Sequence, residues 1–176
     1  MNLQSILETI LFVHGEPITL GKLASLTKKP KKEVEEALRE LDRDMKERGI
    51  VLLYAYGAYQ LGSNPENSAF GENLMKEEFS ENLSRQSLET LAIVAYKGPM
   101  TRIEIDYIRG VNSAFVLRNL TMRGLVERIE NPKDARSWLY RVSFNFLKYL
   151  GLQSLEELPH YAELAKERVG EGVHTS

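Results

Sequence analysis

Apolar residues in the first third of the chain recur at spacings of three and four, the pattern of helices with one buried stripe. β-branched and aromatic residues then cluster on both sides of Gly57, which is typical of a hairpin. The pattern predicts helices over 3–14, 20–26 and 30–48, followed by strands within 50–56 and 58–61. Three helices followed by a hairpin indicate a winged helix-turn-helix domain.

The same order of elements recurs in the second half of the chain. Ser84 is a predicted helix cap, and Thr101 with Glu104 has the spacing of a capping box that begins a short second helix. Asn112 is expected to cap the third helix, which Gly124 ends. Two β-rich runs, 125–130 and 137–142, predict a second hairpin.

The two halves are related residue by residue. The tripeptide Leu-Glu-Thr at 7–9 recurs at 88–90, 81 positions later, and the core positions of the third helices correspond at an offset of 82. Pro17 and Thr19 correspond to Pro99 and Thr101, also at an offset of 82. We therefore predict a mainly α fold with small β wings (α+β), built as two tandem winged helix-turn-helix domains.

The repeat suggests where the domains begin and end. Residues 1–63 form the first predicted domain and 64–83 a linker, because that stretch is rich in Asn, Glu and Gly. Residues 84–159 form the second domain, which includes a C-terminal helix that Ser143 can cap. Residues 160–176 lose their periodicity and are expected to be a flexible tail.

Composition restricts the chemistry of the chain. Of 176 residues 43% are hydrophobic and 27% charged, and none is cysteine, which excludes disulfides, thiolate metal sites and a cysteine nucleophile. Glu8 interrupts the apolar N-terminal run, and no stretch has the length of a membrane span, so we expect a cytoplasmic protein. His14, His160 and His174 lack the spacing of metal ligands. We predict no catalytic residues, no cofactor and no metal, and therefore no enzyme.

Charge is unevenly distributed along the chain. Residues 81–150 carry 11 basic and 7 acidic side chains, a net charge of +4, whereas 1–80 and 151–176 each carry −3. The second domain could therefore touch DNA, and its candidate contacts are Arg118, Arg123, Lys133 and Arg136. The third helix of the first domain is crowded with acidic residues, which phosphates would repel. Any binding of DNA is expected to be weak and without sequence preference.

The basic run Lys28-Lys29-Pro30-Lys31-Lys32 allows two interpretations. Four ammonium groups at a helix N-terminus oppose the helix dipole, which local helix formation does not favour. The run is either a solvated helix cap that nearby acidic residues compensate or a phosphate contact.

A long segment of the second half resembles a known family. Residues 87–113, which end in Arg-Gly-Val-Asn-Ser, closely resemble segregation and condensation protein B. The resemblance continues through Arg123-Gly-Leu-Val126 to the ending Gly151-Leu-Gln-Ser-Leu-Glu-Glu-Leu-Pro159, and covers roughly residues 3–164. One departure is Ala135-Arg-Ser-Trp138, because the family usually has a Gly-Arg-Pro run there.

The resemblance implies a non-enzymatic subunit of an SMC–kleisin complex that acts in chromosome condensation and segregation. It implies a homodimer held by the first domain, binding of the kleisin segregation and condensation protein A, and contact with the SMC ATPase through that kleisin. The apolar first helix supplies the expected dimerisation residues, Leu3, Ile6, Leu7, Ile10 and Leu11. A near-stripe at the end of the second domain supplies the expected kleisin anchors, Tyr140, Phe144, Leu147 and Leu150.

Two alternatives stay open at this point. The chain could instead be a winged-helix transcriptional regulator that uses the third helix of one domain in the major groove. The stripe at 144–150 could equally pack inside the second domain rather than against a partner.

Overall fold

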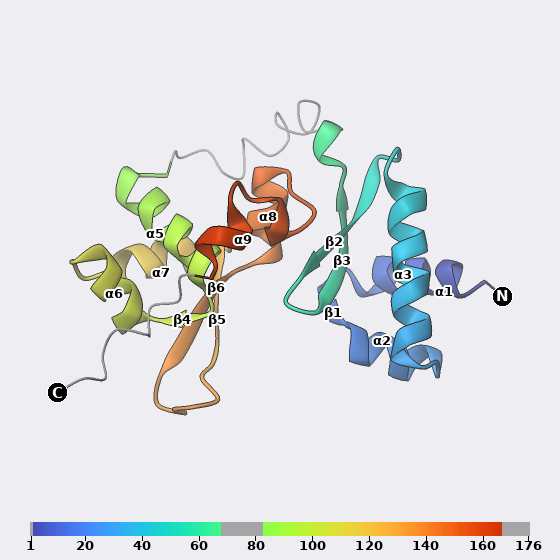
Figure 1. Ribbon diagram of the computed structural model, residues 1–176, viewed down its shortest axis with the longest axis horizontal. Helices are drawn as coiled ribbons and strands as arrows, with labels where there is room; N and C mark the ends of the chain where they lie inside the picture. The colour runs from blue at the N-terminus through green and yellow to red at the C-terminus, as the bar shows by residue number, and fades with distance from the viewer. Residues whose placement is uncertain (1, 68–82, 167–176) are drawn as a thin grey trace. The chain divides into compact units, whose positions relative to one another are not determined.

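The computed structural model describes residues 2–67 and 83–166, which form two compact units (Figure 1). The first unit contains the described residues up to Asn67 together with Leu147–Leu155, and the second contains the remainder. The predicted split assigned all of 84–159 to the second domain, so the grouping of Leu147–Leu155 with the first unit differs from it. Most of the predicted linker and the end of the predicted tail, from residue 167, lie outside the described residues.

The first unit has the predicted order of three helices and a hairpin. Its elements are α1 (Leu3–His14), β1 (Ile18–Thr19), α2 (Leu20–Thr27), α3 (Lys31–Met45), β2 (Ile50–Ala55), β3 (Ala58–Ser63) and a 3₁₀ turn at Pro65–Asn67. The three strands form an antiparallel sheet in the order β1-β3-β2. Leu7, Leu23 and Leu38, one from each helix, are fully buried in its core.

Local sequence explains where these elements begin and turn. The side chains of Asn2 and Thr19 cap α1 and α2, because they accept hydrogen bonds from the backbone N–H groups of Gln4 and Lys22. Tyr56 and Gly57 both have positive φ, which gives the two-residue turn that suits the twist of a hairpin.

The second unit repeats this arrangement. Its elements are α5 (Arg85–Lys97), β4 (Met100–Thr101), α6 (Arg102–Arg109), α7 (Ala114–Met122), β5 (Val126–Glu130) and β6 (Trp138–Val142). Its sheet has the order β4-β6-β5, the same as in the first unit. Both sheets contain a two-residue strand that the sequence analysis did not predict. The two-fold repeat of the winged helix-turn-helix fold is confirmed.

Three further elements follow β6, namely α8 (Phe144–Leu150), a 3₁₀ turn (Leu155–Glu157) and α9 (Tyr161–Leu164). The α9 helix forms where the sequence predicted the start of a flexible tail. The Tyr96 hydroxyl donates a hydrogen bond of 2.9 Å to the carbonyl oxygen of Pro159, and the Tyr96 and Tyr161 rings lie 6.2 Å apart. These contacts hold the segment around α9 against α5. The hydrophobic periodicity of the sequence does not predict this packing.

The caps of the second unit show one correction. Ser84 caps α5, and Thr101 with Glu104 forms the predicted capping box, in which the Thr101 N–H donates to the Glu104 carboxylate at 2.6 Å. The N-cap of α7 is Ser113 rather than Asn112. Asn112 instead closes the turn before it, because its side-chain oxygen accepts from the Ala114 N–H at 2.8 Å.

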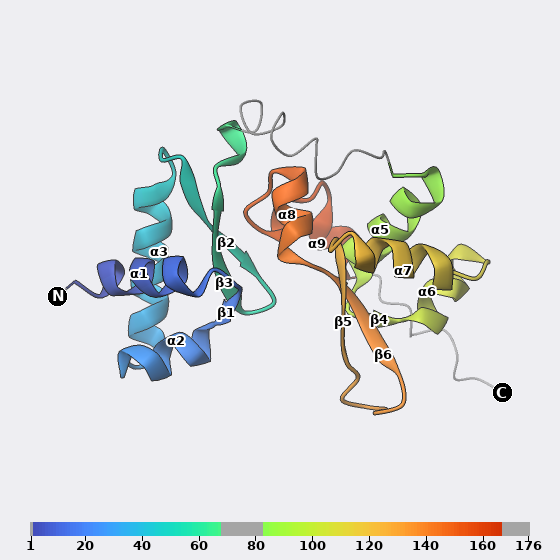
Figure 2. The ribbon, with the colours of Figure 1, turned by 180° about the vertical axis from the view of Figure 1, so that it is seen from behind.

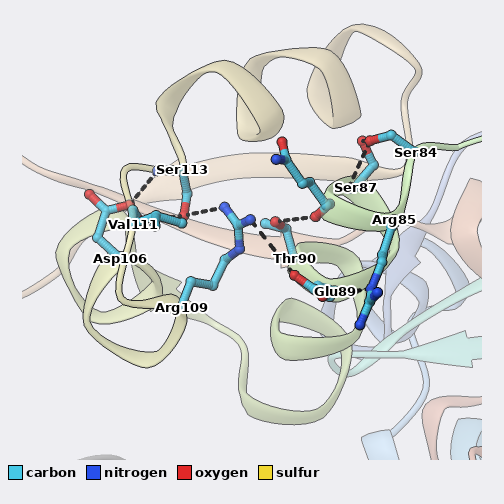
Figure 3. Close-up of polar contacts among 10 residues, drawn as sticks. Ser84, Arg85, Ser87, Glu89, Thr90, Asp106, Arg109, Val111 and Ser113 are labelled. Atoms are coloured by element: carbon cyan, nitrogen blue, oxygen red, sulfur yellow. Dashed lines mark hydrogen bonds and ion pairs between the residues drawn. The ribbon is translucent and has the colours of Figure 1, made fainter.

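A buried polar network joins α5, α6 and the start of α7 (Figure 3). The Ser113 N–H donates to Asp106 Oδ1 at 2.6 Å, and Arg109 donates to the Ser113 hydroxyl at 3.1 Å. Figure 3 shows the Arg109 guanidinium reaching from Ser113 towards Glu89 of α5, whose carboxylate lies 3.9 Å from it. The Arg109 side chain is only 5% exposed, and its buried Nε has no acceptor among the described residues.

This network positions α7, because Ser113 is completely buried at the first turn of the helix. A buried backbone N–H requires a partner, and only the Asp106 carboxylate accepts this one among the described residues.

In the described part of the chain no helix is long and apolar enough to cross a membrane.

We expect Asp106→Ala to lower the free energy of unfolding of the second unit by about 1–3 kcal/mol, since it leaves the buried Ser113 N–H without an acceptor. Trp138 is the only tryptophan of the chain and lies on β6, so its fluorescence during urea unfolding reports on this unit. Asp106→Asn keeps an oxygen acceptor and is the matched control, for which we expect a smaller loss. Equal unfolding midpoints for Asp106→Ala and wild type would contradict this account of the turn.

Candidate functional site

A groove lies between α7 and the β5–β6 hairpin, which is the wing of the second unit; Figure 2 shows α7 beside the base of this hairpin. Its volume is about 420 Å³. We call it the α7–wing groove, and its lining residues are Ala114, Arg118, Thr121, Met122, Arg128 and Tyr140.

Helical periodicity determines what α7 presents to the groove. Val116, Leu117 and Leu120 face the core and are buried. The opposite side carries Arg118 and Met122, four positions apart and therefore neighbours on one face. Met122 is 76% exposed, an unusual degree for a large apolar side chain. The outer face of α7 therefore combines a cation with apolar surface.

Strand register determines what the wing presents. Arg128 of β5 lies directly opposite Tyr140 of β6, so their side chains share one face of the sheet. The Arg128 guanidinium lies over the Trp138 ring at 5.4 Å from its centroid, a cation–π contact that holds it along the strand. Glu127 and Arg141 point to the other face, where they form an ion pair of 2.6 Å.

The electrostatic character of the groove follows from these contacts. Within the described residues, neither Arg118 nor Arg128 forms an ion pair with a carboxylate. Two guanidinium groups therefore line a half-apolar groove with their charge uncompensated. Burial raises the pKa of the Tyr59 and Tyr161 phenols and lowers the pKa of the Lys148 ammonium, but none of these groups lines the groove.

The groove brings together residues that the sequence analysis assigned to different roles. Tyr140 was an expected kleisin anchor and Arg118 an expected DNA contact, and both line it. Lys133 and Arg136 lie on the loop of the wing, where Arg136 pairs with Asp134 at 3.2 Å. Arg123 is the C-cap residue of α7 and does not line the groove.

The other expected kleisin anchors differ in accessibility. Phe144 and Leu147 are buried, whereas Leu150 is 46% exposed. Helical spacing placed them on one stripe but could not show which of them the fold itself covers. Only Leu150 and Tyr140 of this set are available to a partner without rearrangement of the fold.

The expected dimerisation residues divide in the same way. Leu7 and Leu11 belong to the core of the first unit, against which Leu3 and Ile10 pack, and Ile6 is partly exposed. Phe12 and Val13, which follow on α1, were not among the expected dimerisation residues and are mostly exposed. A signal for them existed, because residues 10–13 are four consecutive apolar residues and a helix with one buried stripe cannot cover all four.

Met122, Arg128 and Trp138 were not among the expected site residues either. The exposure of Met122 follows from the outer face of α7, and the positions of Arg128 and Trp138 depend on strand register. Among the remaining candidates, Lys29 of the basic run pairs with Glu33 at 2.6 Å, and His14 is exposed at the end of α1. In the residues that the structure describes, no cluster of three or more histidines and carboxylates has the arrangement of a metal site.

Comparison with known proteins places the chain in a family. The model of segregation and condensation complex subunit ScpB matches residues 5–161. Segregation and condensation protein B of Clostridium tetani (strain Massachusetts / E88) is 40% identical over 168 residues, which cover 93% of this chain and 88% of the relative. The protein of the same name from Clostridium botulinum (strain Hall) is 38% identical over 169 residues, covering 93% of this chain and 86% of the relative.

Two solved ScpB structures are also similar to this chain in sequence. ScpB from Mycobacterium tuberculosis is 32% identical, covers 85% of this chain and 95% of its own, and superposes with a TM-score of 0.41. A structure described as a dimer of the ScpB N-terminal domain complexed with a ScpA peptide is 27% identical over 40% of this chain and 91% of its own, with a TM-score of 0.38. On the family match and the sequence identities, this chain belongs to the family of segregation and condensation complex subunit ScpB.

Proposed function

We propose that this chain is a non-enzymatic subunit of a condensin-like SMC–kleisin complex and acts at the nucleoid in chromosome condensation and segregation. The observation that carries the proposal is the ScpB family match over residues 5–161. In this role the protein forms a homodimer through its first unit, binds the kleisin segregation and condensation protein A, and reaches the SMC ATPase through that kleisin. It needs no cofactor.

The surfaces of the described chain suit such a role. A winged-helix unit of this size buries a modest share of its surface, so large apolar side chains left on its outside favour association with another chain. Phe12 and Val13 provide such a surface on the first unit, and Met122 and Tyr140 on the second. We propose that the first pair contributes to the dimer and that the second contributes to kleisin binding, together with Leu150.

The alternative of a sequence-reading transcriptional regulator has less support. A dimeric reader presents two equivalent recognition helices to two half-sites. The exposed face of α3, the counterpart of α7 in the first unit, carries the Glu35–Arg39 ion pair of 2.8 Å and Glu40, which accepts from Gln4 at 2.9 Å. If α3 lay in the major groove of DNA, these carboxylates would lie near phosphates and be repelled by them.

Co-expression with the kleisin of the same genome tests the proposal directly. We expect the two proteins to co-purify as a stable complex whose mass, measured by light scattering, contains two copies of this chain. Addition of duplex DNA at physiological salt should not displace the kleisin. Failure of the two chains to associate at tens of micromolar would overturn the proposed function.

The dimer surface can be tested with one substitution. Phe12 is 73% exposed, so Phe12→Glu removes apolar surface without disturbing the core, and we expect the dimer to dissociate towards the 20.1 kDa monomer in light scattering. Ile50→Glu, at an exposed apolar residue at the start of β2, is the matched control and should remain dimeric. A Phe12→Glu protein with the dimer mass of wild type would show that α1 is not the contact.

A further inference from the structure

We infer that the α7–wing groove binds an acidic amphipathic segment of the kleisin, whose carboxylates pair with Arg118 and Arg128 and whose apolar side chains pack on Met122 and Tyr140. This inference rests on the proposed function and specifies the chemistry of the contact. It concerns a groove within the second unit alone, lined by residues 114–140.

The charges of the groove favour an anionic partner. Arg118 comes from α7 and Arg128 from β5, so one guanidinium lies on each wall, and within the described residues both lack a carboxylate. Two other arginines of the second unit do pair with carboxylates: Arg85 approaches Glu89 at 3.4 Å, and Arg141 approaches Glu127 at 2.6 Å. Guanidinium groups bind carboxylates through two parallel hydrogen bonds, which favours Asp or Glu on the incoming segment.

The apolar lining requires that the partner is also amphipathic. Met122 is flexible and polarisable, so it can fit the irregular side chains of a docking helix. Tyr140 adds a ring with a polar end, and Ala114 and Thr121 complete the lining. Helices that bind grooves present apolar anchors at spacings of three and four, and acidic residues on the flanks of such a helix would face the two guanidinium groups.

Nucleic acid fits the same groove poorly. Duplex binding depends on the neutralisation of several phosphates, whereas this groove offers two cations separated by apolar surface. The strand that carries Arg128 also carries Glu130 on the same face, and Arg136 on the wing loop is already paired with Asp134. The groove and its edge therefore offer too few cations to neutralise the phosphates of a duplex.

Charge reversal in the full-length protein tests the inference, with the intact kleisin of the same genome as the probe in titration calorimetry. We expect Arg118→Glu to weaken kleisin binding about tenfold or more. Arg102→Glu makes the same change in charge at an exposed position of α6 outside the groove, and its affinity should stay within about twofold of wild type. The affinity of wild type should fall with added salt more steeply than that of Arg118→Glu.

A second pair of variants tests the apolar part. Met122 and Ile103 are 76% and 75% exposed, so Met122→Asp and Ile103→Asp make the same change at equally exposed apolar residues inside and outside the groove. We expect Met122→Asp to weaken kleisin binding about tenfold or more and Ile103→Asp to leave it within about twofold. Thermal melts accompany each titration, and Arg118→Gln replaces Arg118→Glu if the latter does not fold.

The outcomes distinguish this inference from the proposed function. If wild type does not bind the kleisin, the proposed function fails and the inference fails with it. If wild type binds and both groove variants bind as well as their controls, the inference alone is wrong. If a duplex DNA binds wild type more tightly than the kleisin does and Arg118→Glu abolishes that binding, the groove is a nucleic-acid site and the inference is overturned.

Discussion

The hydrogen bond from the buried Ser113 N–H to the Asp106 carboxylate is the contact on which the candidate site depends. It fixes where α7 begins, and a helix turns by about 100° per residue, so a shift of one position would rotate Arg118 and Met122 away from the wing. Arg109 reinforces the same point, because its guanidinium bonds to the Ser113 hydroxyl while lying 3.9 Å from Glu89 of α5. The groove is therefore a consequence of a polar network on the inner side of the helix.

The two units show how one fold can serve different surfaces. Some core positions of the two units correspond, for example Val34 with Val116 and Leu38 with Leu120, all of which are buried. The outer faces of the corresponding helices differ. On α3 the charged groups pair within the unit, as Arg39 does with Glu35, whereas on α7 Arg118 has no carboxylate partner among the described residues. These shared positions are apolar in both units because packing requires it, whereas the exposed positions are not under that constraint.

Local sequence was enough to predict most of the secondary structure but little of the site. Helices and hairpins follow from periodicity and caps, because those depend on residues a few positions apart. The short strands β1 and β4 depend on pairing with β3 and β6, some 40 positions later, and no local pattern indicates them. The groove depends on the strand register that sets Arg128 opposite Tyr140. The sequence alone does not determine this register, because a long loop joins the two strands of the wing. Phe144 and Leu147 show the same limit, since a stripe predicts a buried face but not what buries it.

The uncompensated guanidinium groups give the groove a means of selecting its partner. In the free protein, water solvates Arg118 and Arg128, so their charge costs little. A segment that docks there removes this water, and an apolar segment without carboxylates would leave two cations desolvated and unpaired, at a cost of several kcal/mol. Apolar contact with Met122 and Tyr140 would offset only part of this cost, because burial of a large side chain contributes about 1.5–3 kcal/mol. The groove therefore favours a segment that brings both features and rejects one that brings only apolar surface.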